Sequence, residues 1–411
     1  MSFQQGLSGL NSSSKALDVL GNNIANANTV GFKSAEVHFA DVFANSLAGS
    51  GASQVGIGSA ISGIQQAFSQ GNVTATNNPL DISINGGGFF RMDRNGEITY
   101  TRNGQFHLDN AGYIVNDQAM RLMGFPADAN GLITASSPVD LQLSASQISP
   151  RATSDPLAGT LTANLNLDSR EGVPAVTPFN FANPQTYNYS TALSVYDTLG
   201  VAHTLTMYFQ RASAGGPWNV YGTMDGATPQ AFPSQLAFNT SGVLTTAMPL
   251  VLPSWALTTG AASPWSPGSM DFTGTSQYGS ASSVDRLTQG GYTTGSLTGL
   301  SVGSDGVVQG RYSNGQARNL GQVVLATFTN PNGLQSLGNN QWALTSVSGP
   351  ELVSAPGTGS RGVLQSASVE ESNVDLTAQL VNMITQQRNY QANAQTIKTQ
   401  DQILQTLVNL R

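Results

Sequence analysis

The sequence predicts a mainly β protein with long α-helical termini. It predicts nested β domains, an outer β domain inserted in an inner one, and N- and C-terminal helices packed together as a coiled-coil-like inner domain. Apolar residues recur at helical spacing at both ends, Asn-Gly and Asp-Gly pairs recur between them, and Pro punctuates the middle. Such periodicity predicts amphipathic helices, and such pairs between apolar runs are strong β-hairpin signals.

The first segment, residues 1–34, carries apolar residues that step by four and three positions, which places them on one face of a helix. The stretch Gly21–Lys33 is rich in Asn and Gly. These residues tolerate left-handed backbone, so we expect the helix to end there in a turn. The apolar residues of this helix, which we expect to serve in assembly, are Phe3, Leu7, Leu10, Leu17 and Ile24.

The last segment, residues 370–411, repeats this spacing. No Gly or Pro interrupts Val374–Arg411, so a helix over that stretch would be about 55 Å long. Ser372 and Asp375 resemble a capping box, and Glu370 and Glu371 would lie favourably near the positive helix end. The apolar residues expected to serve in assembly here are Leu376, Leu380, Met383, Tyr390, Ile397, Leu404, Leu407 and Val408.

Between these ends the pattern indicates nested β domains. Asn95-Gly96 and Asn103-Gly104 lie between strand-like runs and predict hairpins. Gly226–Met270 contains no charged residue and several Pro, which favours edge strands and loops. The expected parts are a middle β domain in two pieces, 71–148 and 286–356, an inserted outer β domain, 149–285, and Gly/Ser-rich connectors, 35–70 and 357–369.

The composition excludes several classes of protein. Charged residues make up 9% of the chain, against about 25% in an average soluble domain. Nucleic-acid binding needs a basic surface, which this chain lacks, and no apolar run reaches the length of a membrane-spanning helix. The N-terminus lacks the basic and apolar regions of a signal peptide. Without Cys, the fold depends on packing or assembly.

Residues that carry chemistry are sparse. His38, His107 and His203 lie far apart, with no second ligand at metal spacing. The G-x-G-x-x-G match at 357–362 opens no βαβ unit, so we expect a connector there. Nothing singles out a carboxylate pair for glycoside hydrolysis. We therefore predict no enzyme activity, no catalytic residue, no cofactor and no metal.

The polar face of the C-terminal helix is mostly Gln, Asn and Thr. One interpretation is an ordinary amphipathic helix on a β domain, or a coiled coil within the chain. The other is a helix surrounded by copies of the same chain, because uncharged polar groups hydrogen-bond there without the cost of burying a charge. Identical chains form open helical filaments when the rotation that relates neighbouring chains does not close into a ring.

Blocks at the start, interior and end of the chain resemble one family. Leu20–Lys33 and Leu380–Ala394 resemble the N- and C-terminal signatures of bacterial flagellar axial proteins, the rod and hook group. Asp81–Phe90 and Tyr100–Phe106 are similar to the β domain that these proteins share. The signature positions are Asn22, Asn23, Ala25, Asn26, Asn28, Thr29, Gly31, Phe32 and Lys33, then Gln387, Arg388, Tyr390, Gln391 and Ala392.

Val195–Gly200 and the following His203–Phe209 resemble the hook members in particular. The resemblance implies a structural subunit of a curved hollow tube, a universal joint between rod and filament, with the terminal helices lining its channel. The implied partners are copies of the chain, a distal rod protein, a hook cap, a hook–filament junction protein and the flagellar type III export apparatus. The implied location is the extracellular hook, reached without a cleaved signal peptide; neither nucleic-acid binding nor membrane insertion is expected.

Two alternatives stay open. A distal-rod or hook-associated axial component would share the terminal segments. Distal-rod proteins tend to lack a second large β insertion such as 149–285, and a hook-associated protein would have longer helical ends, so the hook group is favoured. A secreted β-rich adhesin or carbohydrate-active protein would instead function as a monomer that does not need its ends.

Overall fold

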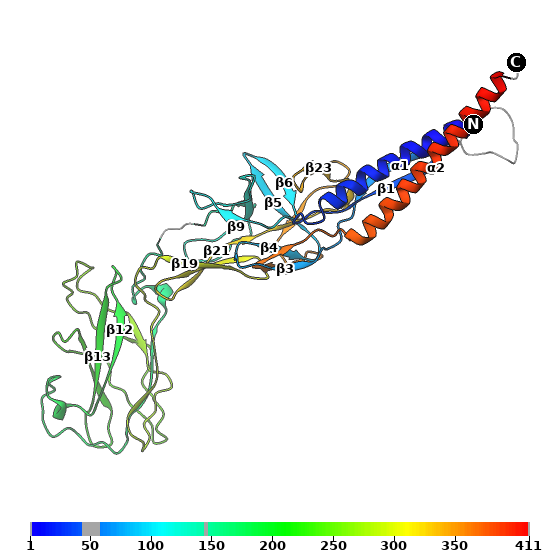
Figure 1. The fold of residues 1–411 in the computed structure, drawn as a ribbon. Coiled ribbons are helices and arrows are strands. Elements are labelled where there is room, and N and C mark those ends of the chain that lie inside the picture. The colour runs from blue at the N-terminus through cyan, green and yellow to red at the C-terminus, as the bar shows by residue number, and fades with distance from the viewer. Residues whose placement is uncertain (1, 43–57, 144–146, 410–411) are drawn as a thin grey trace. The chain divides into compact units, whose positions relative to one another are not determined.

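The structure is a computed structural model that describes residues 2–42, 58–143 and 147–409 (Figure 1). These residues form two compact units. Unit 1 comprises Met1–Ser144, Gly299–Arg311 and Ala317–Arg411, and unit 2 comprises Ala145–Thr298 and Tyr312–Gln316. The predicted fold class, mainly β with helical termini that pack together, is confirmed.

The two helices of unit 1 are α1 (Ser2–Ala25) and α2 (Leu376–Asn409), which lie side by side (Figure 1). Small residues bring them close. A Cβ added at Gly9 would lie 2.7 Å from Nδ2 of Asn393, and one at Gly6 would lie 3.1 Å from Cγ1 of Ile397. Glycines of α1 therefore form part of the contact between the helices.

The ends of the helices differ from the predictions in two details. Asp375, not Ser372, caps α2, because its carboxylate accepts from the N–H groups of Thr377 at 2.9 Å and Ala378 at 3.1 Å. Helix α1 continues through Gly21 to Ala25, so the predicted turn begins five residues after Gly21, at Asn26.

A β-hairpin of β1 (Ala35–Val42) and β2 (Gly58–Gln66) packs against α1. The hydroxyl groups of Ser12 and Ser59 lie 3.0 Å apart across this contact. The described parts of the Gly/Ser-rich segment after α1 therefore pack on the helix.

A 13-stranded sheet forms the β body of unit 1, with the strand order β19-β20-β21-β9-β5-β6-β24-β23 along its main path. Two further ladders, β3 with β27 and β4 with β26, place the segment before α2 beside the start of the β body. Buried side chains such as Ile82, Phe90 and Leu122 form the core beneath the sheet. The strands of the β body are β3 (Val73–Ala75), β4 (Ile82–Asn85), β5 (Phe89–Arg94), β6 (Glu97–Thr101), β7 (His107–Leu108), β8 (Ile114–Val115), β9 (Arg121–Pro126), β10 (Val139–Asp140), β19 (Leu297–Val302), β20 (Val307–Tyr312), β21 (Ala317–Val323), β22 (Leu325–Thr327), β23 (Gln335–Gly338), β24 (Gln341–Ala343), β25 (Leu352–Ser354), β26 (Val363–Ser366) and β27 (Ser368–Glu370), with the short helix η3 (Pro331–Gly333).

Unit 2 contains two four-stranded sheets, ordered β12-β13-β14-β15 and β16-β17-β11-β18. Its core holds Trp218, Trp255 and Trp265. Its strands are β11 (Leu161–Asn166), β12 (Tyr189–Tyr196), β13 (Ala202–Arg211), β14 (Trp218–Met224), β15 (Gln230–Ala231), β16 (Leu250–Val251), β17 (Ser269–Asp271) and β18 (Ser283–Thr288), with the short helices η1 (Pro156–Ala158) and η2 (Pro184–Thr186).

A recurring turn closes many of the hairpins. In each case an Asp or Asn side chain accepts from the backbone N–H groups two and four residues further on, which holds the turn without a second side chain. The Asn-Gly and Asp-Gly pairs of the sequence do not by themselves reveal this pattern. The residues that make it are Asp109, Asn116, Asp128, Asp197 and Asn239.

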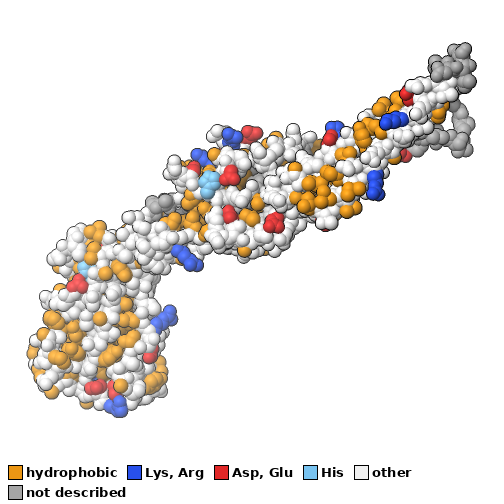
Figure 2. Space-filling view, in the orientation of Figure 1, with side chains coloured by type: hydrophobic (Ala, Val, Ile, Leu, Met, Phe, Trp, Pro, Cys, Tyr) orange, Lys and Arg blue, Asp and Glu red, His pale blue; other side chains and the backbone are white. Residues whose placement is uncertain are grey.

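Among the described residues, no helix is long and apolar enough to cross a membrane, and no group of His, Asp and Glu is arranged to hold a metal ion. Figure 2 shows few charged side chains and places hydrophobic ones along the helices of unit 1.

Candidate functional site

The candidate site is the place where the end of α1, the start of α2 and the β body meet within unit 1. We call it the terminal junction. It combines a buried ionic cluster, side-chain amides that bind backbone groups and one closely packed glycine. Its residues are Asn23, Gly31, Lys33, Arg102, Asn340, Glu370 and Asn373.

The ionic cluster joins three distant segments. The Nζ of Lys33 donates to Oε1 of Glu370 at 2.7 Å and to the carbonyl oxygen of Ser69 at 2.7 Å. Nη1 of Arg102 donates to Oε2 of the same glutamate at 3.3 Å. The side chains of Lys33, Arg102 and Glu370 are 0%, 3% and 0% exposed. One buried carboxylate therefore pairs with two buried cations.

Burial sets the electrostatics of this cluster. It lowers the pKa of Lys33 and the pKa of Arg102, and attraction to Glu370 opposes the lowering in each case. The Arg102 guanidinium also donates to the carbonyl oxygen of Gly86 at 2.9 Å and lies 5.3 Å from the centre of the Phe89 ring. Without Glu370, two desolvated cations would face each other.

Asn23 connects α1 to the hairpin and to α2. Its amide donates to the carbonyl oxygen of Ala35 at 2.8 Å and accepts from the N–H of the same residue at 3.0 Å. It also donates to Oε1 of Gln379 at 3.3 Å. An amide satisfies both backbone groups of Ala35 because it carries a donor and an acceptor.

Asn373 and Asn340 make the corresponding contacts from the other side. Oδ1 of Asn373 accepts from the N–H of Ser34 at 2.7 Å, and its Nδ2 donates to the carbonyl oxygen of Ala67 at 2.7 Å. Nδ2 of Asn340 donates to the carbonyl oxygen of Val30 at 2.8 Å. The backbone that leaves α1 is thus held by side chains of the C-terminal segment and of the β23–β24 turn.

Gly31 allows this backbone to approach the β body. Its φ of +71° lies in the left-handed region, and a Cβ would lie 2.6 Å from the backbone nitrogen of Asn103. Its N–H donates to the carbonyl oxygen of Glu370 at 2.7 Å. Glycine is needed on both counts, the dihedral angle and the close contact.

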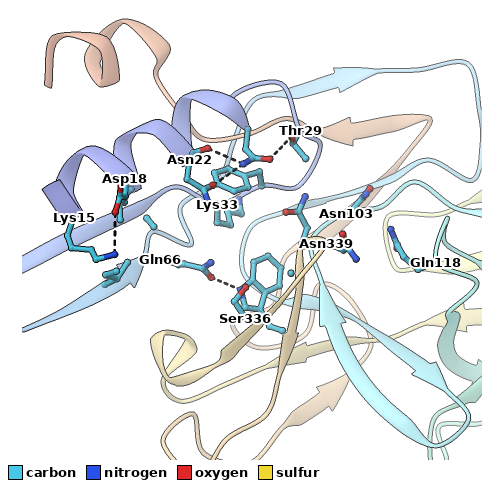
Figure 3. Close-up of a pocket in the computed structure, with 18 residues that line it drawn as sticks. Lys15, Asp18, Asn22, Thr29, Lys33, Gln66, Asn103, Gln118, Ser336 and Asn339 are labelled. Atoms are coloured by element: carbon cyan, nitrogen blue, oxygen red, sulfur yellow. Dashed lines mark hydrogen bonds and ion pairs between the residues drawn. The ribbon is translucent and has the colours of Figure 1, made fainter. Parts of the chain in front are cut away.

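A cavity of about 670 Å³ lies next to the junction, between α1 and the β23–β24 turn (Figure 3). Amide side chains such as Asn22, Gln66 and Asn339 line it. Nε1 of Trp342 donates to Oε1 of Gln66 at 2.5 Å, and Lys15 pairs with Asp18 at 3.3 Å on α1. This lining offers hydrogen bonds and no arrangement of a nucleophile with a base.

Four models of flagellar protein families match the chain in order. The model for the flagellar basal body rod protein matches residues 3–33, and that for the FlgE/F/G D1 domain of the flagellar hook protein matches 83–153. The FlaE D2 domain of the flagellar basal body protein matches 166–292, and the C-terminal model of the flagellar basal body rod FlgEFG proteins matches 365–410.

The chain is 41% identical to the flagellar hook protein FlgE of Escherichia coli strain K12 over 420 residues, covering 100% of both chains. The chain belongs to the flagellar hook protein family. It is also 32% identical to FlgE of Treponema pallidum strain Nichols over 470 residues, covering 100% of this chain and 99% of the relative. The resemblance to flagellar axial proteins is thereby confirmed.

A solved structure shares the fold. The crystal structure of the Helicobacter pylori flagellar hook protein FlgE2 matches with a TM-score of 0.51 and 12% identity, covering 72% of this chain and 100% of that chain. This likeness shows a shared three-dimensional fold.

Part of the N-terminal hook-family signature lies in the junction. Its Asn23, Gly31 and Lys33 are buried there. Asn26 donates to Asn22 at the end of α1 and accepts from Thr29 at 3.1 Å. The positions that are half-buried are Asn26, Thr29 and Phe32, and those that are exposed are Asn22, Ala25 and Asn28.

The C-terminal hook-family signature lies elsewhere, on the exposed surface of α2. Its residues do not enter the junction, and the structure gives them no role within a single chain. They are Gln387, Arg388, Tyr390, Gln391 and Ala392.

The apolar residues of the helices are only partly covered within the chain. The exposed ones are Phe3, Leu7, Leu376, Leu380, Tyr390 and Leu404, between 37% and 54% exposed. The half-buried ones are Leu10, Leu17, Ile24, Met383 and Ile397. The side chains of Leu407 and Val408 lie outside the described part of the structure.

Sequence reasoning missed Arg102, Asn340 and Asn373, and it misjudged Glu370. The carboxylate of Glu370 points to Lys33 and Arg102, because two buried cations attract it more strongly than a helix end does. The sequence did contain a signal for this ionic cluster. Only 9% of the residues are charged, so a charged residue next to a family signature is expected to have a partner of opposite charge.

Proposed function

We propose that this chain is the structural subunit of a flagellar hook, which self-assembles into a curved hollow tube and passes torque from rod to filament as a universal joint. The observation that carries the proposal is the apolar surface that α1 and α2 leave exposed on a single chain. Full-length relatives named flagellar hook protein support it. The match of the D2-domain model to residues 166–292 favours a hook over a distal rod protein.

The exposed apolar surface of α2 is suited to contact further helices. Leu380, Val381 and Ile384 are 45%, 58% and 51% exposed. Nine residues separate Ile384 from Asn393, and at 3.6 residues per turn this places them on roughly opposite faces of the helix. Since Asn393 faces Gly9 of α1, the Ile384 face is directed away from the helix partner within the chain.

Copies of the same chain are the neighbours that we infer. The residues beside this apolar surface are mostly uncharged, so identical helices can approach without repulsion between like charges. In this proposal residues 1–34 and 370–411 form the inner, channel-lining domain, and the predicted assembly residues lie between its copies. When the rotation that relates one copy to the next does not close into a ring, repeating the same contact generates a helical tube.

The terminal junction then acts as a mechanical link. It connects the helices to the β body through buried ionic and amide contacts, so a force on the helices reaches the β body without a loose hinge between them. We further infer export by the flagellar type III apparatus, an extracellular place in the hook, and contacts with a distal rod protein, a hook cap and a hook–filament junction protein.

Electron microscopy of the purified full chain tests this function. We expect tubes from the natural chain and none from Leu404→Asp, because an aspartate at that 54% exposed position would be buried between copies. Leu132→Asp is the matched control, since Leu132 is a 68% exposed leucine outside the helices. A natural chain that stays monomeric would support the adhesin or carbohydrate-active alternative, and tubes from Leu404→Asp would refute the role of the helices.

A further inference from the structure

His203 of unit 2 is buried between two carboxylates. It lies on β13 and is 5% exposed. Its Nδ1 lies 2.6 Å from Oδ2 of Asp225, and its Nε2 lies 3.2 Å from Oδ2 of Asp197. Both ring nitrogens thus face carboxylate oxygens, which come from the turn before β13 and from the end of β14.

The two carboxylates are themselves held in place. Asp197 accepts from the N–H groups of Leu199 and Val201 at 2.9 Å and from the hydroxyl of Thr259 at 2.8 Å. Oδ1 of Asp225 accepts from the N–H of Thr204 at 2.7 Å. Neither carboxylate is positioned by the imidazole alone.

The charged groups that act on the ring, among the described residues, are Asp197 and Asp225. The other neighbours are neutral. The Trp265 ring lies 6.2 Å away, centre to centre, and Thr259 contacts the ring's partner Asp197. Both charged groups that act on the ring are therefore negative.

The chemistry of imidazole decides which form fits this site. A neutral ring has one N–H and one nitrogen lone pair, whereas the protonated ring has two N–H donors. Only the protonated ring can donate to both aspartates. A neutral ring would direct a lone pair at one carboxylate, which loses a charge-assisted hydrogen bond and adds repulsion.

We propose that His203 is a proton-binding clamp, whose protonated ring joins the Asp197 turn to the end of β14 and whose loss of the proton loosens unit 2. The clamp spans all three long strands of one sheet: the turn joins β12 to β13, the histidine lies on β13, and Asp225 follows β14. The turn it holds also carries Leu199 and Val201, which are 55% and 41% exposed.

The pKa of the ring agrees with the geometry. Burial alone would lower the pKa of His203, but the hydrogen bonds to Asp225 and Asp197 and their charges outweigh it, so the pKa is raised. A histidine with a raised folded-state pKa stabilises the fold fully below its unfolded pKa of about 6.5. This stabilisation is lost as the pH rises through the folded-state pKa.

The test is NMR titration of the histidine rings in the full-length monomer, with His38 and His107 assigned by substitution. We expect His203 to be protonated on both nitrogens at pH 6.5 and to lose its proton at a higher pH than an unperturbed imidazole does. Asp225→Asn should weaken proton binding at His203 by about tenfold or more. Asp225 is 50% exposed, so this variant should fold.

Stability gives the second readout. The denaturant midpoint of unit 2, followed by fluorescence of its buried Trp residues, should fall from pH 6.5 to 9 in the natural chain and not in His203→Gln. His107→Gln is the matched control, since His107 is 55% exposed and 3.9 Å from Asp117. A neutral His203 ring at pH 6.5, or an unchanged proton affinity in Asp225→Asn, would overturn the proposal even if His203→Gln fails to fold.

Discussion

The Nζ of Lys33 lies 2.7 Å from Oε1 of Glu370, and both side chains are fully buried although 337 positions separate them in the chain. The contact connects the segment after α1 to the segment before α2. In an assembly built on the terminal helices, this is the point through which each chain would hold its β body.

Glu370→Gln should destabilise unit 1 more than Lys33→Met. Glutamine leaves Lys33 and Arg102 buried without an opposing charge, which we expect to cost about 3–5 kcal/mol in the free energy of unfolding. Lys33→Met leaves the Arg102–Glu370 pair balanced, so its cost should be smaller. Denaturant unfolding of the full-length monomer measures both.

Lys15→Met is the control for these two variants, because the Lys15–Asp18 pair is exposed. Its effect should stay within about 1 kcal/mol. If Glu370→Gln were no more harmful than Lys33→Met, the view that one carboxylate stabilises both buried cations would be wrong.

The sequence could predict the parts of this junction that depend on residues close together in the chain, but not the contacts between distant segments. The period of the apolar residues predicted both helices because neighbours along a helix lie a few residues apart. The Lys33–Glu370 contact depends on the register in which β3 pairs with β27. A single sequence does not show the register between two distant strands. The family signatures marked Lys33 as important but did not identify its partner.

The apolar residues of the helices illustrate the same limit. Their spacing predicts one apolar face on each helix, yet it does not show which face meets the other helix. Gly6 and Gly9 make that contact, because glycine permits the closest approach. A pattern search weights large apolar residues and overlooks small ones.

Gly31→Ala should separate the segment after α1 from the β body. Alanine is strained at a φ of +71°, and its Cβ would lie 2.6 Å from the backbone nitrogen of Asn103. Hydrogen–deuterium exchange should therefore rise in the peptides that contain Gly31 and Glu370. Gly21→Ala is the control: a Cβ there would meet no atom outside its own stretch of helix within 4 Å, so the better helix former should leave exchange unchanged or lower it. Equal behaviour of the two variants would contradict the assigned role of Gly31.

Acid should weaken unit 1 through Glu351. Its carboxylate accepts from Nε of Arg91 at 2.9 Å and from the hydroxyl of Tyr100 at 2.6 Å. Burial would raise the pKa of Glu351, but these hydrogen bonds outweigh it and lower the pKa. A lowered folded-state pKa gives stability that is present above the unfolded pKa and lost as the pH falls through the folded pKa.

Glu351→Gln should therefore lower the unfolding midpoint of unit 1 at pH 7 and flatten its decline between about pH 5 and pH 3. Glu97→Gln serves as the control, because Glu97 is exposed at the start of β6. If the unfolding midpoint of Glu351→Gln declined with pH as steeply as that of the natural chain, Glu351 would not be a source of the acid sensitivity.

Asn23→Asp tests the amide contacts with almost no change in shape. The carboxylate can still accept from the N–H of Ala35, but it has no N–H to donate to the carbonyl oxygen of Ala35 or to Gln379. Since Asn23 is 1% exposed, it would bring a buried charge against a carbonyl oxygen, and we expect a loss of about 1–3 kcal/mol. Asn28→Asp, at an exposed position of the same signature, should change little. Limited proteolysis of the monomer should then release the β1–β2 hairpin faster from Asn23→Asp than from Asn28→Asp, and equal rates would show that Asn23 does not hold the hairpin to α1.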